Sequence, residues 1–376
     1  MPKPRKILMT GDTVGGVWTY ALELARALQP HDVEVQLALM GPPLTPAQRA
    51  EAEKIPNLSL FKSDYKLEWM PDCWPDVRRA GDWLLHLAQR LGPDVIHLNG
   101  YAHANLPWNK PTLLVGHSCV FSWWQAVHGE APPQDWHRYQ SEVINGLRGA
   151  HLVVTPTAAM LRALETHYGR IIHGRVIPNG RDPKLFRPTR KQQFILSAGR
   201  VWDAAKNIKQ LAELAPELPW PVFVAGECQA PKRGENQRTL HRRCHTLGRL
   251  AEAELRDWYG AAPIYALPAL YEPFGYTPLE AGLSACALVL GDIESLREVW
   301  DAAAVFVDPR DSEALKTELL RLIEDPGYRR EMSRHARERA LRFKSERMAR
   351  DYLAAYSDLL AYARPYRREE MFAQCA

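Results

Sequence analysis

The feature that most constrains this chain is the repeated alternation of short apolar runs with longer segments of helical spacing. Ile7–Thr10 is an apolar run, and a glycine-containing loop separates it from a helical pattern over Val17–Leu28. The same order recurs through the first half of the chain, which predicts a parallel sheet with helices on both faces. We expect further strands at 33–39, 94–99, 112–117 and 152–155, and further helices at 76–91, 134–147 and 157–168.

The alternation stops at a polar segment and then starts again. Arg181–Gln193 contains Pro183 and Pro188 and has the character of a linker between domains. Beyond it we expect strands at 194–198, 222–226, 264–267, 287–290 and 305–307, with a long polar loop over 228–245. We expect helices at 205–214, 251–259, 312–324, 328–343 and 345–362. Two such halves in 376 residues predict an α/β protein of two lobes with a ligand site between them.

The composition excludes several classes of protein. The formal net charge of +4 is too small to indicate a nucleic-acid partner. The six cysteines show no paired Cys-x-x-Cys spacing, which favours reduced thiols and a cytoplasmic location. No apolar run approaches the ~20 residues that a membrane span requires, and the N-terminal sequence does not resemble a signal peptide.

One stretch carries two carboxylates, Glu272 and Glu280, on either side of a Pro/Gly turn. Thr277 is the predicted N-cap of a helix, Pro278 its first residue and Glu280 an acid of its first turn. Gly275 allows a ligand to approach the backbone closely, and a helix start favours an anion. The stretch therefore suits a phosphorylated sugar. Alternatively, Glu280 is only a capping acid and Glu272 only a surface residue.

The glycine loop after the first expected strand is a second candidate site. Gly15 and Gly16 stand at the start of the expected helix, where the carboxyl end of a parallel strand binds ligands. The loop lacks the GxGxxG pattern, so it gives no support to a dinucleotide. The loop either binds a phosphate or a sugar, or is only a tight turn.

Five motifs stand in a particular order along the chain. They are the Gly15-Gly16 loop, His117 after a strand, Val-Ile-Pro-Asn-Gly at 176–180, Gly199-Arg200 with Lys206-Asn207, and the pair Glu272 and Glu280. In this order they resemble retaining GT-B glycosyltransferases, and family 4 of that class most. The resemblance implies two Rossmann-like domains facing each other across a cleft, at 1–182 and 183–345. It also implies that residues 346–376 form a helix crossing back to the first domain, plus a tail.

The resemblance assigns the charged residues to a nucleotide-diphosphate sugar. A pyrophosphate leaving group gains negative charge that must be stabilised, and Arg200 and Lys206 follow a strand end where they could hold it. The alternative for this pair is two solvated surface charges. By resemblance, Glu280 binds ribose hydroxyls and Glu272 binds the donor sugar. The other donor-binding residues implied are Gly15, Gly16, Phe274, Gly275, Tyr276 and Thr277.

His117, Trp123 and Trp124 are candidates on the first-domain side. By resemblance His117 lies by the donor sugar and contributes to catalysis with Arg200, Lys206 and Glu272; the alternative is a structural histidine. Trp123 and Trp124 are candidate platforms for an acceptor, since aromatic faces stack on sugars, although packing under a loop explains them equally well. The segment 69–83 is either a peripheral membrane contact or a core-facing helix, and its apolar spacing favours the core.

The function we expect is transfer of a sugar from a nucleotide-diphosphate sugar, with UDP favoured, to a hydroxyl acceptor. The acceptor is a glycan, a lipid-linked saccharide or a small molecule, as in polysaccharide biosynthesis, and the reaction is retaining and front-face. We expect no cofactor and no metal, because the chain has no Asp-x-Asp motif. The alternatives are a nucleotide-sugar epimerase on the same fold and a non-catalytic nucleotide- or sugar-binding protein. Departures from the family pattern between Ala285 and Ser295 leave the donor sugar open.

Overall fold

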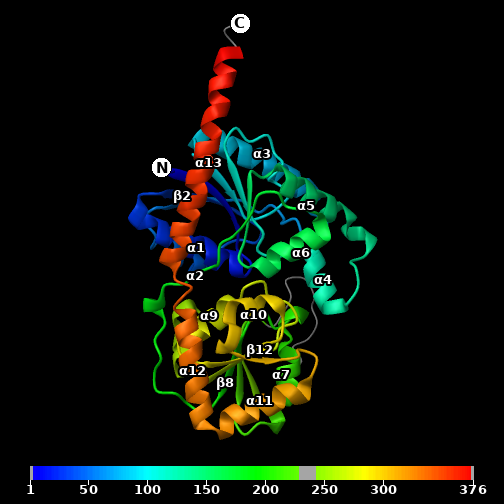
Figure 1. Ribbon diagram of the computed structural model, residues 1–376, viewed down its shortest axis with the longest axis vertical. Coiled ribbons are helices and arrows are strands. Elements are labelled where there is room, and N and C mark those ends of the chain that lie inside the picture. The colour runs from blue at the N-terminus through cyan, green and yellow to red at the C-terminus, as the bar shows by residue number, and fades with distance from the viewer. Residues whose placement is uncertain (1–2, 228–242, 374–376) are drawn as a thin grey trace. The chain divides into compact units, whose positions relative to one another are not determined.

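The computed structural model describes residues 3–227 and 243–373, with the backbone alone for 362–373. The chain groups into two compact units. One contains the chain up to Phe121, Ala131–Gly180 and the chain from Ser345 onward; the other contains Ser122–Glu130 and Arg181–Lys344. Each unit is a parallel sheet with helices on both of its faces (Figure 1). The prediction of two parallel α/β, Rossmann-like domains is confirmed.

The described residues of the first unit form a seven-stranded sheet in the order β3-β2-β1-β4-β5-β6-β7. Its strands are β1 (Lys6–Asp12), β2 (Glu34–Met40), β3 (Leu58–Lys62), β4 (Val95–Leu98), β5 (Thr112–Val115), β6 (Leu152–Thr155) and β7 (Gly174–Val176). The helices that belong to this unit are α1 (Gly16–Leu28), α2 (Pro46–Ala52), α3 (Trp74–Leu91), α5 (His137–Gly149), α6 (Ala158–Tyr168) and α13 (Ser345–Ala373), with short 3-10 helices at Gln29–His31 and Gln134–Trp136. Helix α4 (Val120–His128) begins in this unit and continues into the second.

The described residues of the second unit form a six-stranded sheet in the order β10-β9-β8-β11-β12-β13. Its strands are β8 (Ile195–Ala198), β9 (Val222–Ala225), β10 (Cys244–Gly248), β11 (Ile264–Leu267), β12 (Ala287–Gly291) and β13 (Val305–Val307). Its helices are α7 (Ile208–Leu214), α8 (Glu252–Ala261), α9 (Tyr276–Leu283), α10 (Glu294–Trp300), α11 (Ser312–Glu324) and α12 (Pro326–Ala340). Short 3-10 helices occur at Pro183–Leu185, Ala204–Lys206, Ala215–Glu217 and Asp301–Ala303.

Three strands have the bounds that the sequence predicted, and some strands at sheet edges were missed. β6, β11 and β13 have the predicted bounds, because each is a short apolar run between turn residues. β3 and β10 were not predicted, and both lie at a sheet edge, where exposed polar residues weaken the apolar signal. β10 lies in the segment 228–245, so the predicted loop is wrong at its end; residues 228–242 of that prediction lie outside the described residues.

The start of α6 and the end of α3 are each marked by a residue type that the sequence shows directly. α6 begins after Thr157, whose hydroxyl accepts the N–H of Met160 at 3.1 Å, so the predicted cap is confirmed. α3 ends at Gly92 with φ 59°, a left-handed cap that glycine adopts without strain. Its face towards the core includes Val77, Leu84 and Leu87, as predicted for a core-facing helix.

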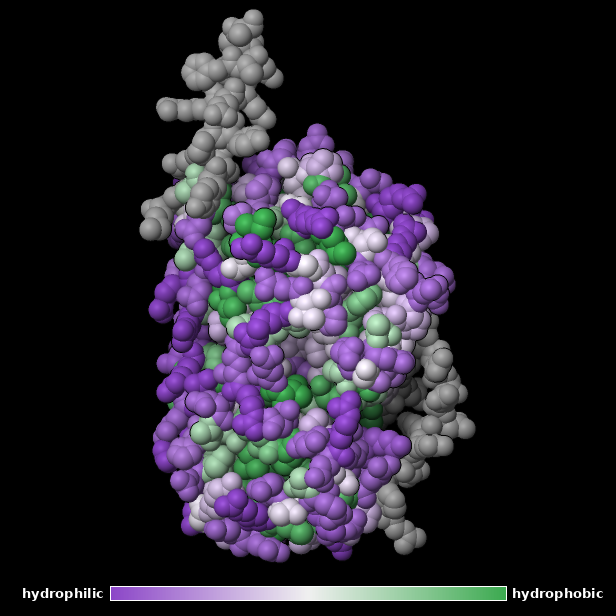
Figure 2. All heavy atoms as spheres, turned by 45° about the vertical axis from the view of Figure 1, so that its right-hand side comes forward, coloured by the Kyte–Doolittle hydropathy of each residue, from purple (hydrophilic) through white to green (hydrophobic). Residues whose placement is uncertain are grey.

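Among the described residues, no helix is both long and apolar enough to span a bilayer. On the face drawn in Figure 2, hydrophobic side chains stand in small groups among hydrophilic ones. Trp69 is 37% exposed, whereas Trp83 is partly buried and packs edge to face on Tyr65, with ring centroids 6.0 Å apart. The aromatic residues of the segment 69–83 are thus shared between the core and the surface.

Helix α9, which carries Glu280, packs tightly into the second unit. A Cβ on Gly282 would lie 2.6 Å from Cη2 of Trp300 and 3.3 Å from Cβ of Ala340. The side chain of Trp300 is completely buried, so it has no room to move away. Gly282 therefore allows α9 to lie against α10 and α12, and this contact fixes the position of Glu280.

We predict that Gly282→Ala lowers the free energy of unfolding by about 1–3 kcal/mol, because the new methyl group overpacks against Trp300. The matched control is Gly81→Ala in α3, where the nearest atoms belong to the Leu106 side chain at 3.3 Å. Both substitutions raise helix propensity by a similar amount, about 1 kcal/mol. Urea unfolding of the two variants measures the difference, and equal midpoints would contradict the packing argument.

Candidate functional site

The charged residues of the second unit gather where the strand order of its sheet reverses. β8 has β9 on one side and β11 on the other. Because the strands are parallel, the loops after β8 and β11 leave from the same edge, and ligands of open α/β sheets bind at such a point. The loop after β8 carries Arg200 and Lys206, and the loop after β11 carries Glu272.

Lys206 and Glu272 join these two loops. Nζ of Lys206 lies 2.7 Å from Oε2 of Glu272, and their side chains are 15% and 14% exposed. The Ser295 hydroxyl donates to the carbonyl of Glu272 at 2.6 Å, and the N–H of Leu270 donates to the carbonyl of Ala205 at 2.8 Å. The structure therefore brings together an ammonium and a carboxylate that the sequence assigned to one ligand.

Arg200 is held by Asp203, a residue that sequence reasoning missed. A guanidinium nitrogen of Arg200 donates to Oδ2 of Asp203 at 2.6 Å. Asp203 also accepts the indole N–H of Trp123 at 3.0 Å and the backbone N–H of Ala205 at 3.1 Å. Burial disfavours the charged form of Asp203, but the charges of Arg200 and Lys206 outweigh this and lower its pKa. Asp203 is thus an anion that fixes the side chain of Arg200.

The two candidate acceptor platforms lie on α4. The rings of Trp123 and Trp124 meet edge to face with centroids 6.1 Å apart, and both contact His128. The indole N–H of Trp123 is used by Asp203, whereas that of Trp124 has no hydrogen-bond partner among the described residues. Their role in acceptor binding stays a prediction.

The start of α9 corrects the predicted helix cap. The predicted cap was Thr277, but the helix begins at Tyr276 and its cap is Gly275, with φ 91°. The Thr277 hydroxyl instead donates to the carbonyl of Ala198 at the end of β8, at 3.3 Å, a contact that the local sequence does not show. The helix therefore starts two residues earlier, and Glu280 falls in its second turn rather than its first.

The turn before α9 is largely packed into the second unit. The side chain of Phe274 is 2% exposed and packs edge to face on Tyr276 and Phe343. A Cβ on Gly275 would lie 3.3 Å from Cγ of Glu272, so the positive φ and the close approach together require glycine. The approach of this backbone to a donor stays a prediction, and the side chain of Tyr276 is partly exposed.

Glu280 is buried, and a buried cation lies beside it. Its side chain is 8% exposed, and Oε1 lies 3.0 Å from Nε of Arg181, which is 2% exposed. Burial, and then the charge of Glu280, raise the pKa of the Tyr259 hydroxyl well above its usual range. Arg181 stands in the segment predicted as a linker, where nothing in the local sequence indicates a role at a site.

In the first unit, the glycine loop lies at the corresponding reversal between β1 and β4. Gly15 is the N-cap of α1 with φ 81°, and no side chain caps this helix. Gly15 and Gly16 are both exposed. The carboxylate of Asp12 accepts the N–H of Val14 at 2.8 Å and so shapes the loop. The loop therefore offers backbone N–H groups at the edge where a ligand is expected.

His117 follows β5 and is oriented by Asn99. Nε2 of His117 lies 2.8 Å from Oδ1 of Asn99, and Nδ2 of Asn99 donates to the carbonyl of Thr10 at 2.6 Å. Because the amide nitrogen is used by Thr10, the amide oxygen faces the ring, and Nε2 of His117 carries the proton. Burial lowers the pKa of His117 to about 3, so the neutral ring keeps Nδ1 as an acceptor.

A fully buried histidine, His97, is linked to His117 through Tyr20. Nδ1 of His97 lies 2.6 Å from the hydroxyl of Tyr356 on α13, and Nε2 lies 3.1 Å from the hydroxyl of Tyr20 on α1. Tyr20 in turn packs edge to face on His117, with centroids 4.5 Å apart. Burial, and then the neighbouring His117, lower the pKa of His97 to about 3. The final helix thus supports the candidate histidine through His97 and Tyr20.

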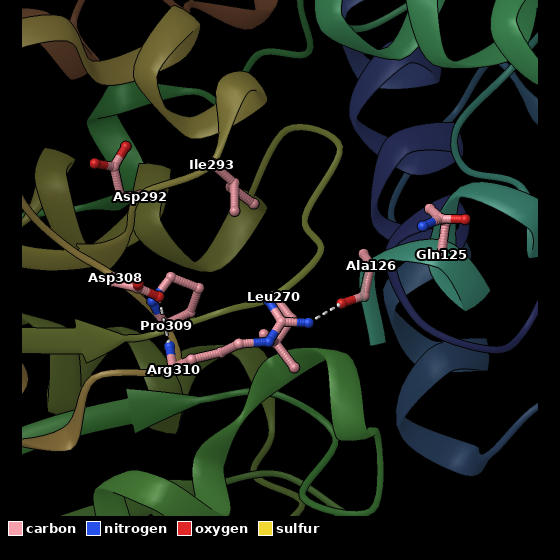
Figure 3. Close-up of a pocket in the computed structure, with 8 residues that line it drawn as sticks. All are labelled: Gln125, Ala126, Leu270, Asp292, Ile293, Asp308, Pro309 and Arg310. Carbon is pink, nitrogen blue, oxygen red and sulfur yellow. Dashed lines mark hydrogen bonds between the residues drawn. The ribbon is translucent and has the colours of Figure 1, made fainter. Parts of the chain in front are cut away.

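A cavity of about 340 Å³ opens at the carboxyl ends of β11, β12 and β13. Figure 3 shows the side chain of Arg310 extending towards Ala126, whose carbonyl accepts from the guanidinium at 2.9 Å. Asp292, at another edge of the cavity, is held by Arg297 at 2.6 Å. The residues that line the cavity are Gln125, Ala126, Leu270, Asp292, Ile293, Asp308, Pro309 and Arg310. Two of them belong to the stretch 285–295 that the sequence associated with the identity of the donor sugar.

The site residues that sequence reasoning missed fall into two groups. Asp203 and Asn99 follow strands that had been predicted, so a search for polar residues at strand ends would have found them. Arg181 and Arg310 contact partners distant in the sequence, Glu280 and Ala126, and no local pattern marks them.

Comparison with known proteins identifies two family models that together span most of the chain. The model described as "Glycosyl transferases group 1" matches residues 181–339. The model described as "Glycosyltransferase Family 4" matches residues 14–185. The two matches meet at the boundary between the two halves and include the candidate residues of both.

The relatives agree with these family models. D-inositol 3-phosphate glycosyltransferase of Xylanimonas cellulosilytica is 25% identical over 402 aligned residues, covering 93% of this chain and 92% of that protein. Other curated relatives match a shorter stretch, and the match spans about half of their length. Sucrose-phosphate synthase of Thermosynechococcus elongatus has a TM-score of 0.82 at 20% identity, covering 95% of this chain and 100% of that one. HepE of Anabaena, solved with UDP-glucose, has a TM-score of 0.72 at 18% identity, covering 94% of this chain and 99% of that one.

The buried histidines predict a loss of stability in acid. His97 has a pKa of about 3 in the folded protein against 6.5 for the unperturbed side chain, so the unfolded chain binds the proton more readily. The free energy of unfolding should therefore fall as the pH drops from about 6.5 towards 3, by up to about 1.4 kcal/mol per pH unit for this group. In His97→Asn the free energy of unfolding should depend less steeply on pH, by the equivalent of up to one bound proton. Urea unfolding at several pH values measures this, and an unchanged slope would contradict it.

Proposed function

This chain is a glycosyltransferase with the GT-B fold, similar to family 4, and we propose that it transfers a sugar from a nucleotide-diphosphate sugar to a hydroxyl group with retention of configuration. The observation that carries the proposal is the meeting of Lys206 and Glu272, 2.7 Å apart, with Arg200 on the same loop. Two cations and a carboxylate at the reversal point of the sheet match the charges and hydroxyls of such a donor.

In the proposed complex, Arg200 and Lys206 bind the pyrophosphate. The guanidinium offers five N–H donors and the ammonium three, while the contacts with Asp203 and Glu272 each occupy one nitrogen. Both cations therefore keep donors for phosphate oxygens without breaking these pairs. The charge that develops on the leaving phosphate is stabilised by groups already held in position, the most effective form of electrostatic catalysis.

The two glutamates bind different parts of the rest of the donor. Glu272 is partly exposed in the loop beside Lys206, so it can reach the hydroxyls of the donor sugar. Glu280 lies in the second turn of α9 and binds the ribose hydroxyls of the nucleotide. The backbone of the turn at Gly275 approaches the sugar and the phosphate, as does the loop of Gly15 and Gly16.

The proposed reaction is a front-face displacement. The bond between the anomeric carbon and the phosphate oxygen breaks, and the acceptor oxygen forms its bond to the same carbon on the same face. The proton of the acceptor hydroxyl passes to the leaving phosphate oxygen, so no protein base is needed. His117, neutral and with Nδ1 as an acceptor, hydrogen-bonds a hydroxyl of the donor sugar. Arg200 and Lys206 supply the positive charge that a metal supplies in other enzymes, and we propose a metal-independent reaction.

For the donor we favour a UDP-sugar, on the likeness to HepE, which was solved with UDP-glucose. For the acceptor we propose a glycan, a lipid-linked saccharide or a small molecule, bound in part by Trp123 and Trp124. The nucleotide-sugar supply of the cytoplasm suits this reaction, and we propose that location for the protein.

We predict that Lys206→Ala lowers kcat/KM for nucleotide release by about 100-fold or more, because it removes charge from the leaving phosphate. The control is Lys209→Ala, three residues further along the chain, whose side chain is 81% exposed and lies 3.5 Å from Glu213, a surface pair of little energetic weight. Thermal unfolding checks that both variants are folded. Turnover of Lys206→Ala at the wild-type rate would show that the donor site lies elsewhere.

We predict that one nucleotide class raises the thermal midpoint in a panel of UDP-, GDP-, ADP- and dTDP-sugars. A ligand at 100 times its Kd that binds only the folded protein stabilises it by about 2.7 kcal/mol. The shift should be largest for UDP-sugars and should diminish in Lys206→Ala but persist in Lys209→Ala. A panel without any shift would contradict the proposed donor class, and a larger shift with another base would correct the nucleotide.

A further inference from the structure

Arg181 is a buried arginine with two carboxylates. Its side chain is 2% exposed. One terminal nitrogen lies 2.7 Å from Oε1 of Glu252, and Nε lies 3.0 Å from Oε1 of Glu280. The guanidinium also lies over the ring of Phe186, 5.1 Å from its centroid. Arg181 thus touches one glutamate that the proposed function uses and one that it does not.

The backbone of Arg181 is fixed as firmly as its side chain. Its N–H donates to the carbonyl of Phe343 at 3.0 Å, and it forms an isolated parallel β-bridge with Lys344. Both partners are among the last residues of the second unit in the sequence. The guanidinium that contacts Glu280 therefore extends from a backbone that is itself hydrogen-bonded within the second unit.

The two glutamates depend on Arg181 to different degrees. Glu252 is 30% exposed, so water can solvate its carboxylate. Glu280 is 8% exposed, and an ionised carboxylate at that depth costs several kcal/mol unless a cation and hydrogen bonds offset it. The planar guanidinium can serve both carboxylates at once, which an ammonium group cannot do with the same geometry.

We propose that Arg181 is a positioning residue for nucleotide recognition, which holds Glu280 ionised and in one orientation towards the ribose of the donor. The inference rests on the proposed function, because it takes Glu280 as the group that binds ribose hydroxyls. Arg181 itself does not contact the nucleotide. A purely structural ion pair would contribute to stability and leave ribose recognition unchanged, and this difference can be measured.

The test compares a ribonucleotide with its deoxy forms on the full chain. Of UDP, GDP and ADP, the diphosphate that binds most tightly is titrated calorimetrically alongside its 2′-deoxy and 3′-deoxy forms. A hydrogen bond to a charged group is worth about tenfold or more in affinity, so the wild type should favour the ribo form by at least about tenfold over one deoxy form. In Arg181→Gln this ratio should fall to about one, and in Arg181→Lys to an intermediate value. Glu252→Gln, the matched control at the same guanidinium, should keep the wild-type ratio.

The outcomes separate this inference from the proposed function. If neither these three diphosphates nor dTDP binds, the proposed function is wrong. If one binds with no preference for ribose, Glu280 does not bind ribose and the inference is overturned with it. If Glu280→Gln abolishes the preference while Arg181→Gln and Arg181→Lys keep it in full, Arg181 has only a structural role. Should Arg181→Gln fail to fold, Arg181→Lys decides, and an unchanged ratio there counts against the proposal.

Discussion

Parallel pairing of the strands determines where this protein can place reactive groups. A parallel strand must be followed by a crossover, so every loop after a strand leaves from the same edge of the sheet. The order of the strands then selects one point on that edge, between β8 and β11 in the second unit and between β1 and β4 in the first. Lys206 and Glu272 meet at the first of these points, and the loop of Gly15 stands at the second.

Three ion pairs in the second unit differ in how deeply their cations are buried. Arg200 is 36% exposed beside Asp203, Lys206 is 15% exposed beside Glu272, and Arg181 is 2% exposed beside Glu280. A group near the surface can exchange part of its hydration for a ligand at low cost, whereas a fully buried group can only support another. The gradient suits a division of labour in which Arg200 and Lys206 meet the donor and Arg181 stabilises the residue that does.

The central strands and their helices could be predicted because each signal is local. β6 is four apolar residues between turns, and Thr157 marks a helix start without reference to the rest of the chain. The failures needed information from elsewhere in the fold. Threonine is a common helix cap, but the hydroxyl of Thr277 donates to the carbonyl of Ala198. Arg181 stands among prolines and charges, and its partner Glu280 is distant in the sequence. The candidate site could thus be predicted as a set of strand-end residues, but the pairs that orient them could not.

The two helices that start at candidate glycines differ from helices that start at a capping side chain. α6 and α11 begin at Thr157 and Asp311, whose side chains accept backbone N–H groups. α1 and α9 begin instead at Gly15 and Gly275, both with positive φ and without a side-chain cap. Glycine in place of a capping side chain costs a helix roughly a few tenths of a kcal/mol, a loss that the packing of α9 against Trp300 offsets. A helix start without a side-chain cap keeps backbone N–H groups that an anion can complete, and this holds for each of the two helices in its own unit.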